Sequence, residues 1–565
     1  MSDEPITPRR IADDHVDRVA ALDPLISARL GLHPEDTRQP DLSPEGSEAA
    51  ADLDRHTLAA LDALGAFDAP GTPVDPADRA CARLLRERLT AALAVHDAGD
   101  DFSRLRNIAG PVHGVREILS LTPTESEQDW AVVAGRLRSI PGALDGYRQT
   151  LAEGVSRGLL SAPRQVAAVI DQLTTWTGRA GGSGGSWFAG FVAPGPDRLR
   201  PELDAAALAA TASVADLRDW LRDTYAPAAA GTPDAVGRER YLRAVRSGTG
   251  ADLDVEEAYA WAWGEFHRLR ADMAVEAERV LPGATPVQAM RHLEEHGHAV
   301  KGEEGIRVWL QQVMDGAIEA LDGTHFDISQ RIRRVESRLA PEGSSAAAYY
   351  TAPSLDFSRP GRTYLPTLGR ESFPTWQLVS TWYHEGVPGH HLQLAQWVAC
   401  ADRLSRYQVT LGKVSANLEG WALYSERLMD DLGFFEQPAN RLGFLDEQML
   451  RTIRVIIDIG MHLRLAVPAD SGFHPGERWT PELATAFMAA FNGSPDDVRT
   501  SEINRYLGWP GQAIGYKLGE RAWLRGREAA RRRHGAGFDL KAWHMAALSQ
   551  GSLGLDDLAD SLAAL

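Results

Sequence analysis

The sequence has almost no cysteine: of its 565 residues only Cys81 and Cys400 are cysteines. Two thiols are too few for a disulfide framework or a cysteine-based metal site. Long apolar runs are also missing, because no segment approaches the roughly 18 apolar residues that a membrane-spanning helix needs. The first residues, MSDEPITPRRIADDHVDR, lack the apolar stretch of a signal peptide. We therefore expect a cytoplasmic protein with no membrane partner.

Positive charge is scarce relative to negative charge. The chain has 59 Lys and Arg against 78 Asp and Glu, which gives a net charge of −19. Nucleic acids and anionic membranes both require clustered Lys and Arg, so this balance argues against either partner. The hydrophobic content of 44% and the mean hydropathy of −0.27 are ordinary for a globular chain. Disordered, collagen-like and disulfide-rich classes are excluded.

Most of the chain carries apolar residues at the three- and four-residue intervals of amphipathic helices, for example in RACARLLRERLTAALAVH and GIRVWLQQVMDGAIEALDG. We therefore predict a mainly α-helical fold. The exception is Ala348–Thr367, which is rich in Tyr, Thr and Pro. Its composition predicts one or two short strands with a tight turn at Arg359–Arg362.

Histidine is concentrated in one short segment, TWYHEGVPGHHLQLAQ. This segment places His384, Glu385, His390 and His391 within eight residues. Neutral imidazole is a preferred zinc ligand, and the glutamate beside the first histidine of a zinc-hydrolase helix acts as the general base. The segment therefore predicts a zinc site with His384 as one ligand and Glu385 as the base.

The spacing departs from the usual H-E-x-x-H helix, because Pro388 occupies the position of the second histidine. On a straight helix His390 would lie on a different face from His384, and His391 would lie about 10.5 Å further along the axis. Pro388 and Gly389 interrupt helices, however. A two-residue bulge would bring His390 to the second ligand position, and a three-residue bulge would bring His391 there. Histidines that pack beside a helix N-terminus without a metal are the simpler alternative.

A third ligand is expected downstream, in NLEGWALYSERLMDD, because a two-histidine zinc site needs one more protein ligand and an open position for water. Glu419 and Glu426 are seven residues apart with Ala422 between them, so both project from one face of a helix. We expect Glu419 to be the third ligand and Glu426 to lie behind the ligands and orient them. The alternative is two solvated acids on a surface helix.

Four motifs together carry a resemblance to a known family. HEGVPGHHLQ, EGWALYSERL, RVIIDIGMH and PGQAIGYKLGE resemble the bacterial family known as domain of unknown function 885 (DUF885). That family is similar to helical zinc peptidases with a deep cleft: thimet oligopeptidase, angiotensin-converting enzyme and carboxypeptidase Taq. The resemblance implies one gluzincin-like domain over residues 1–565, a two-lobed helical body with a central cleft and a small sheet next to the metal-site helix. An N-terminal lobe over 1–240 and a catalytic lobe over 241–565 are the expected division.

The resemblance also implies roles for single residues. In those peptidases an H-E-x-G-H helix supplies two ligands and the base, and Gly389-His390 resembles its G-H pair, which favours His390 over His391. Such enzymes stabilise the oxyanion with a Tyr or His from the C-terminal half. In this chain Tyr516 is the first candidate for that role and His462 the second.

Substrate contacts are expected from the same comparison. Tyr506 and Arg505, in EINRYLGW, are weaker candidates near the reacting bond. The strand around Tyr350 resembles an edge strand that holds an extended peptide by backbone hydrogen bonds. Arg359 or Arg362 would meet a substrate carboxylate through two parallel hydrogen bonds. Core packing of the tyrosines and a surface turn for the arginines are the alternatives.

A second histidine segment, RHLEEHGH, fits the inverted zinc pattern H-x-x-E-H at His292 and His296. It is equally typical of a charged helix end, with Gly297 as the stop, and no comparable glutamate helix follows it. We interpret it as a chance match.

Together these features predict a zinc-dependent metallopeptidase that hydrolyses small peptides, with one Zn²⁺ per chain and Glu385 activating a zinc-bound water. A metal-dependent hydrolase of a non-peptide amide or ester is an alternative. A non-catalytic, peptidase-like binding protein is another. The sequence leaves open the choice of endo- or exopeptidase, the side-chain specificity, the use of another divalent metal and the oligomeric state.

Overall fold

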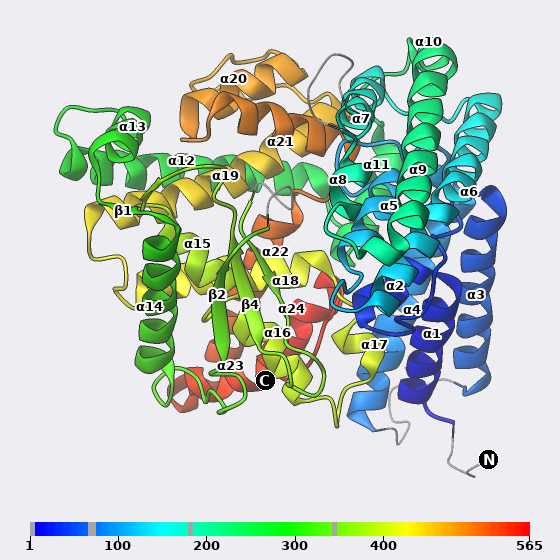
Figure 1. Cartoon of the computed structure of the whole chain (residues 1–565). Helices are drawn as coiled ribbons and strands as arrows, with labels where there is room; N and C mark the ends of the chain where they lie inside the picture. Colours follow the sequence, from blue (N-terminus) through cyan, green and yellow to red (C-terminus); the bar gives the residue numbers. More distant parts are fainter. Residues whose placement is uncertain (1–5, 66–74, 179–184, 342–346) are drawn as a thin grey trace. The chain divides into compact units, whose positions relative to one another are not determined.

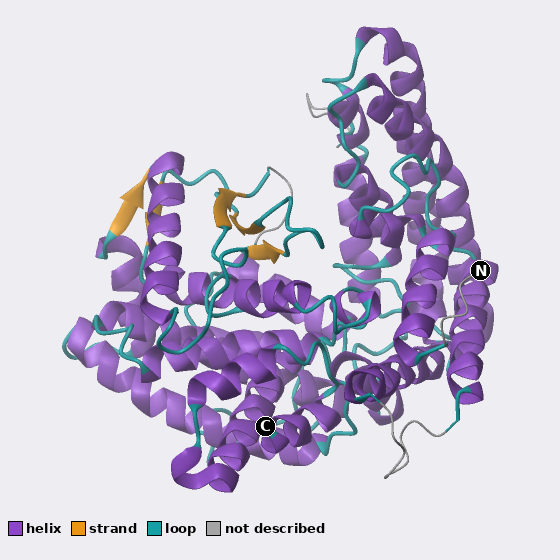
Figure 2. Ribbon diagram, turned by 90° about the horizontal axis from the view of Figure 1, so that it is seen from below, coloured by secondary structure: helices purple, strands orange, loops and turns teal. Residues whose placement is uncertain are grey.

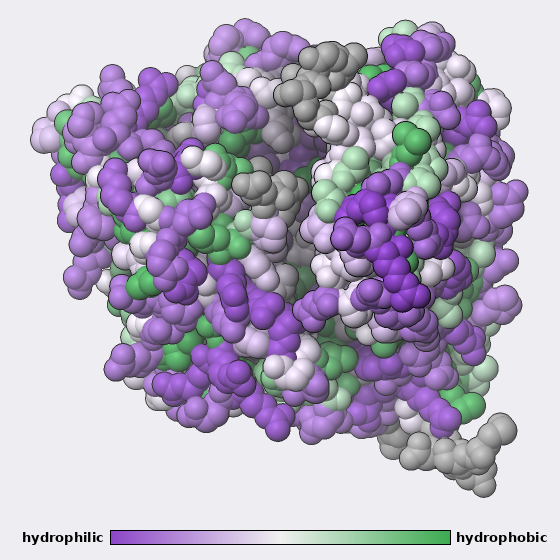
Figure 3. All heavy atoms as spheres, viewed as in Figure 1, coloured by the Kyte–Doolittle hydropathy of each residue, from purple (hydrophilic) through white to green (hydrophobic). Residues whose placement is uncertain are grey.

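The structure is a computed structural model that describes residues 6–65, 75–178, 185–341 and 347–565. Helix accounts for 67% of it and the sheets are few and small, so the predicted mainly α-helical class is confirmed (Figures 1 and 2). Within the described ranges, every helix is too short or too polar to cross a lipid bilayer. Hydrophilic side chains cover most of the face drawn in Figure 3, and apolar ones are scattered between them.

The chain divides into two compact units. The first comprises Met1–Arg243 and Leu507–Trp509, and the second comprises Ala244–Tyr506 and Pro510–Leu565. The sequence-based division after residue 240 lies three residues before the boundary in the structure, which follows Arg243. The inclusion of Leu507–Trp509 in the first unit was not predicted.

Proline opens most helices of the first unit. Pro8, Pro24 and Pro44 each stand in the first turn, where a missing N–H costs nothing, and a side chain of the preceding residue caps the helix. Buried apolar side chains between Leu105 and Ala229 form one core of this unit, with Leu137 and Val169 fully buried. The helices are α1 (Pro8–Leu22), α2 (Pro24–Leu30), α3 (Pro44–Ala63), α4 (Pro76–Asp97), η1 (Asp100–Ser103), α5 (Pro111–Ser120), α6 (Glu127–Arg157), α7 (Pro163–Trp176), α8 (Trp187–Val192), η2 (Asp197–Leu199), α9 (Arg200–Trp220), η3 (Leu221–Tyr225), α10 (Ala226–Ala229) and α11 (Arg238–Thr249), within which the division falls.

Helices also form the body of the second unit. They are α12 (Val255–Val280), α13 (Pro286–His296), α14 (Glu303–Leu321), α15 (Leu378–Glu385), α16 (His390–Ala399), α17 (Arg406–Val409), α18 (Ser415–Asp431), α19 (Pro438–Leu463), α20 (Pro481–Phe491), α21 (Asp496–Gly508), α22 (Gly515–His534), η4 (Gly535–Gly537), α23 (Leu540–Leu548) and α24 (Leu555–Ala564). Helix α12 packs along α19, and α18 packs along α22. The second pair approaches closely because glycines meet: a Cβ at Gly420 would lie 2.5 Å from the Cα of Gly519.

Two small sheets complete the second unit. Strand β1 (Ala299–Lys301) pairs antiparallel with β5 (Ser372–Pro374). In the other sheet β4 (Gly361–Leu365) lies between β2 (Val335–Leu339), which runs parallel to it, and β3 (Tyr349–Thr351), which runs antiparallel. Helix α16 packs against β3 and β4 (Figure 1).

The predicted turn at Arg359–Arg362 is wrong in position. The chain reverses between Ser354 and Arg359, where the Ser354 N–H donates to the Arg359 carbonyl at 3.1 Å. Gly361 and Arg362 already belong to β4. The proline and glycine that suggested a turn therefore mark the entry to the strand.

Candidate metal centre

The segment Gly386–Gly389, between α15 and α16, holds two extra residues. The backbone N–H of Gly389 donates to the carbonyl of Tyr383, six residues earlier, whereas a continuous helix would bond four residues back. A Cβ at position 389 would lie 1.9 Å from the carbonyl oxygen of His384, so only glycine fits there. This geometry corresponds to the two-residue bulge, which brings His390 rather than its neighbour beside His384.

Helix α18 holds this bulge in place. The indole N–H of Trp421 donates to the carbonyls of Pro388 at 2.8 Å and Gly389 at 3.1 Å. The Gly389 carbonyl also accepts from the backbone N–H of Gln393, in the first turn of α16. On α15, the fully buried Trp382 donates to the Ser337 hydroxyl of β2 at 3.0 Å. The motif is therefore fixed both by the helix that carries Glu419 and by the sheet.

His384, His390 and Glu419 converge on one point. Each offers one ligand atom, and these atoms lie within 4.8 Å of one another. The Nε2 atoms of His384 and His390 lie 3.3 Å and 3.6 Å from the same oxygen, Oε2 of Glu419. Throughout the described part of the chain, no other group of three or more His, Cys, Asp or Glu has such spacing. The structure thus brings together the three predicted ligands.

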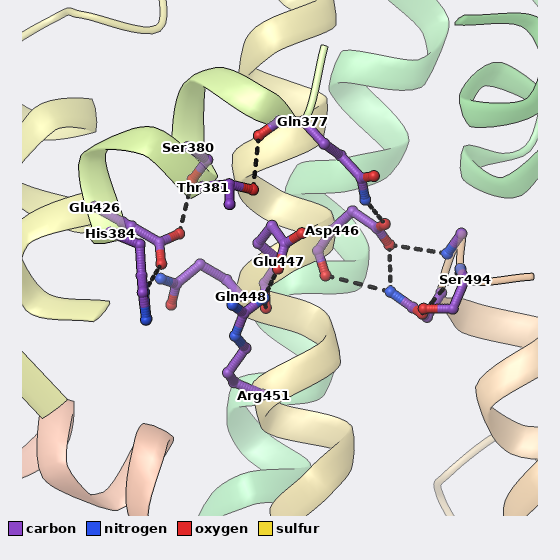
Figure 4. A network of polar contacts seen from close by, with 12 residues as sticks. Gln377, Ser380, Thr381, His384, Glu426, Asp446, Glu447, Gln448, Arg451 and Ser494 are labelled. Atoms are coloured by element: carbon purple, nitrogen blue, oxygen red, sulfur yellow. Dashed lines mark hydrogen bonds and ion pairs between the residues drawn. The ribbon is translucent and has the colours of Figure 1, made fainter. Parts of the chain in front are cut away.

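Glu426 holds His384 from behind (Figure 4). Its Oε1 lies 2.7 Å from Nδ1 of His384, and its Oε2 accepts a hydrogen bond of 2.7 Å from the Ser380 hydroxyl. The carboxylate is only 1% exposed. A carboxylate on one ring nitrogen fixes the histidine tautomer and directs the other nitrogen, Nε2, toward an ion. Glu426 therefore orients a ligand, in the outer position expected for it.

Burial and charge shift the acid–base properties of this group. Burial alone would lower the pKa of His384, but hydrogen bonds to Glu419 and Glu426 outweigh it and raise the pKa to about 9. For Glu419 the opposite holds: burial would raise its pKa, and the two histidines bring it well below the usual range. Glu385 is buried beside them and its pKa is raised, chiefly because it is removed from water. A carboxylate with a raised pKa suits a general base that works near neutral pH.

The donor set fits a divalent transition metal. Two imidazole nitrogens and one carboxylate oxygen form a common zinc-hydrolase ligand set, and the hydrogen bond that Nδ1 of His384 donates to Glu426 is the support such a ligand needs. Nδ1 of His390 is buried and makes no hydrogen bond to any described residue. The fold thus positions this ring without using its nitrogens for structure.

His391, the alternative second histidine, does not join the group. Its Nε2 lies 2.6 Å from the carbonyl of Ile332, and its Nδ1 lies 2.9 Å from the hydroxyl of Tyr350. Both ring nitrogens are therefore engaged, and burial lowers the pKa of the ring to about 4. His391 ties α16 to β3 and to the segment before β2. The Tyr350 hydroxyl is engaged in this tie, so it is not free for a substrate.

The two oxyanion candidates lie in different surroundings. Tyr516, at the start of α22, packs its ring 4.7 Å from Cζ of Arg454, and burial followed by the charge of Glu419 raises its pKa. Its hydroxyl makes no hydrogen bond within the described residues. His462 is 1% exposed, and its Nε2 lies 3.1 Å from the carbonyl of Tyr506. The structure thus leaves Tyr516 next to the ligand group and places His462 in the core.

The remaining predicted substrate contacts are engaged elsewhere. Tyr506 is fully buried and donates to Glu502, and Arg505 donates to the same carboxylate at 2.9 Å. Arg362 donates to Glu336 at 3.0 Å across β2 and β4. Arg359 donates to the carbonyl of Ala352 at 2.7 Å and so closes the loop before β4. These interactions make Tyr506 a core residue and the two arginines supports of the small sheet.

The segment with the inverted zinc pattern forms the last turns of α13. The His292 and His296 rings stack 4.9 Å apart, and His296 is exposed. They gather no third ligand among the described residues.

Sequence reasoning missed three residues that build the site: Ser380, Trp421 and Arg451. Ser380 precedes His384 by four residues, so it had to share its helix face. Trp421 follows Glu419 by two residues and its bond to the bulge has no sequence signal. Arg451 lies on α19, 12% exposed, within electrostatic range of Glu426 and Glu419.

Comparison with known proteins gives the fold and the family. A crystal structure of a putative lipoprotein from Colwellia psychrerythraea matches with a TM-score of 0.80 and 21% identity, and covers 99% of each chain. A putative lipoprotein of unknown function from Shewanella oneidensis matches with a TM-score of 0.73 and 17% identity, and covers 99% of this chain and 100% of that one. No curated protein matches the sequence. The profile of the family described as bacterial protein of unknown function (DUF885) matches residues 24–562, and the chain therefore belongs to that family.

Proposed function

We propose that the protein is a zinc-dependent peptidase that hydrolyses small peptides. The observation that carries the proposal is the convergence of His384, His390 and Glu419 within 4.8 Å, with Glu426 bonded to the far nitrogen of His384. The helical zinc peptidases that the motifs resemble use two histidines and a glutamate from a following helix in the same way. A surface acid cluster would need none of this buried support.

The residues around the cluster have distinct roles in the proposed reaction. A divalent ion held by the three ligands would polarise the attacking water and the scissile carbonyl. Glu385 accepts the proton of that water and returns it to the leaving amine. The unbonded Tyr516 hydroxyl donates to the oxygen on which negative charge develops.

The small sheet favours a peptide over another amide or ester. Within the described residues strand β3 pairs with β4 alone, so its other edge offers backbone groups to an extended chain. Helix α16, which carries His390, packs against this strand. A hydrolase of small non-peptide amides or esters would have no use for such an edge.

Metal content per chain tests the proposal first, measured by mass spectrometry on wild type, Glu419→Ala and Glu304→Ala. Glu304 is an exposed acid paired only with Arg307, so its loss controls for non-specific binding. We expect about one zinc per chain in wild type and in Glu304→Ala, and none in Glu419→Ala. Failure of wild type to bind zinc offered at neutral pH would refute the hydrolase and leave the non-catalytic alternative.

Peptide cleavage tests the reaction itself. A library of short peptides incubated with the zinc-loaded protein should yield cleaved products, identified by mass, and Glu385→Gln should yield none. Cleavage of ester or non-peptide amide substrates alone would replace the peptidase with the second hydrolase class.

A further inference from the structure

Two side chains on α19, beside the candidate site, each have one hydrogen-bond donor without a partner in the described chain. Nε2 of Gln448 and Nε of Arg451 are buried, and neither donates to any described residue. The two residues are three apart, so they project from the same face of the helix. Leaving a buried donor without an acceptor is unfavourable, and two such donors side by side indicate an acceptor that the described chain does not supply.

The free edge of Arg451 is the one that binds carboxylates. Its Nη1 pairs with Glu447 and donates to the Glu447 carbonyl at 3.3 Å, which leaves the edge formed by Nε and Nη2 without a partner in the described chain. Elsewhere in the protein this edge clamps an acid. Arg441, on the same helix, uses Nε at 3.0 Å and Nη2 at 3.4 Å to hold Asp430. Arg307 holds Glu304 in the same manner.

These donors lie close to the residues of the candidate metal centre. The Gln448 amide is fully buried, and its Oε1 accepts a hydrogen bond of 2.5 Å from Lys517, which fixes the amide orientation and leaves Nε2 free. In Figure 4 Gln448 and Arg451 lie on α19 beside the His384–Glu426 pair. Arg451 is within electrostatic range of Glu385 and Glu419, and burial lowers the pKa of its guanidinium, as expected for a cation that lacks full compensation.

We propose that Gln448 and Arg451 bind the carboxylate at the C-terminus of a peptide, so that the enzyme is an exopeptidase that acts from that end. Arg451 supplies two parallel hydrogen bonds and the charge, and Gln448 supplies a third donor to the same group. This inference rests on the proposed peptidase function and names its substrate class. A carboxylate on an Asp or Glu side chain offers the same chemistry, so the experiment separates the two sources.

Binding to the inactive, zinc-loaded Glu385→Gln protein is the test, measured by calorimetry with three N-acetylated tripeptides. One ends in Ala with a free carboxylate, one is its C-terminal amide, and one is an amide that ends in Glu. We expect the free acid to bind at least about tenfold more tightly than either amide. Combined with Glu385→Gln, the substitution Arg451→Gln should remove the preference for the free acid and leave the affinity for the amide unchanged. Arg451→Lys keeps the charge but loses the two parallel N–H donors, and it should retain part of the preference for the free acid.

Controls keep the outcome interpretable. Arg441→Gln removes an arginine of the same helix whose edge is already occupied, and it should keep the full preference for the acid. Melting curves identify any variant that fails to fold, and Gln448→Leu provides an independent variant of the subsite. Equal affinity for acid and amide, or a preference that survives in Arg451→Gln, would overturn the inference. Tight binding of the Glu-ended amide would assign the subsite to side-chain carboxylates and overturn the exopeptidase assignment.

Failure of this inference is distinguishable from failure of the peptidase. Wild type that binds zinc and cleaves amide-blocked peptides as fast as free acids is a peptidase without a C-terminal subsite. Wild type that binds no zinc and cleaves nothing refutes the peptidase, whichever peptide it binds. If the peptidase function and the C-terminal subsite are both supported, the mass of the released fragment shows how many residues lie beyond the cleaved bond.

Discussion

The core of the first unit contains few ionisable side chains, whereas the core of the second contains a series of them. Among the described residues of the first unit, the buried charged or histidine side chains are His15, Asp78 and Arg136. Those of the second are Glu276, His384, Glu385, His391, Glu426, Asp446, Arg454, Asp458, His462, Lys517, Glu520 and His544.

The few buried ionisable groups of the first unit have clear structural partners. Asp78 accepts from Arg9 at 2.9 Å, and Arg136 donates to the carbonyl of Ile118 at 3.1 Å. In the second unit, three of the buried groups, His384, Glu385 and Glu426, belong to the ligand cluster or lie beside it. Burial of charge is costly, so a fold keeps such groups where chemistry requires them. If the proposed function holds, the contrast places the chemistry in the second unit and leaves the first as a scaffold.

The largest expected effect separates chemistry from stability within the second unit. Glu385→Gln should lower kcat on a cleaved peptide by about 10²- to 10⁴-fold, because the base is lost while the ligands remain. Zinc content and melting temperature should stay close to wild type, since a neutral amide replaces a carboxylate that burial already disfavours. A variant that loses zinc or unfolds would show that Glu385 serves the structure.

Shortening a buried side chain of the first unit should have the opposite effect: stability falls and zinc binding is unchanged. Leu137 is fully buried in the apolar core, and Leu137→Ala should lower the free energy of unfolding by about 2–5 kcal/mol, because a cavity replaces the side chain. Zinc per folded chain should not change. Urea unfolding and metal analysis of the same sample check both statements. Loss of zinc at temperatures where the variant is still folded would contradict the assignment of stability to the first unit and of metal binding to the second.

The fold class and the grouping of two histidines with Glu419 could be predicted because they depend on local signals. Helices follow from apolar periodicity, and two histidines with a glutamate helix behind them specify a donor set. The choice between His390 and His391 could not be made from spacing, because it depends on how many residues the bulge absorbs. That number is fixed by contacts distant in sequence, such as the bond from Trp421 to Pro388.

The side-chain partners of Tyr506 and Tyr350 could not be predicted for a related reason. A sequence motif identifies a residue type but not the partner that its side chain meets. Tyr506 finds Glu502 on its own helix, four residues back, and Tyr350 finds His391 on α16. Buried ion pairs and hydrogen bonds between distant segments therefore decide which polar residues stay free to meet a substrate.

An intermediate effect is expected from the residue that orients His384. Glu426→Gln keeps the size of the side chain but loses the charge that holds Nδ1, so zinc affinity should fall about 10- to 100-fold. Competition with a chelator of known affinity measures the change. Glu304→Gln, at the exposed pair on α14, is the matched control and should have no effect. Unchanged affinity in Glu426→Gln would mean that Ser380 and the surrounding packing suffice to hold the ring.

The smallest effect concerns a property that the two units share. Each buries a histidine outside the ligand group: His15 in the first, with a pKa lowered to about 4, and His544 in the second, with a pKa lowered to about 3. Burial is the main cause in both cases. Between these values and the ordinary pKa of about 6.5, the unfolded chain binds more protons than the folded one. Stability is therefore fully present above pH 6.5 and is lost as the pH falls.

At pH 5 each histidine should cost about 2 kcal/mol of stability relative to neutral pH. Urea unfolding at pH 7 and pH 5 measures the loss, and His15→Gln or His544→Gln should each remove its own share of it, because glutamine does not titrate. His544→Gln also tests the hydrogen bond of 2.8 Å to Tyr424, which should lower stability equally at both pH values. If the pH-dependent loss disappeared only in His544→Gln, acid sensitivity would belong to the second unit alone. That result would extend the contrast between the two cores from chemistry to stability.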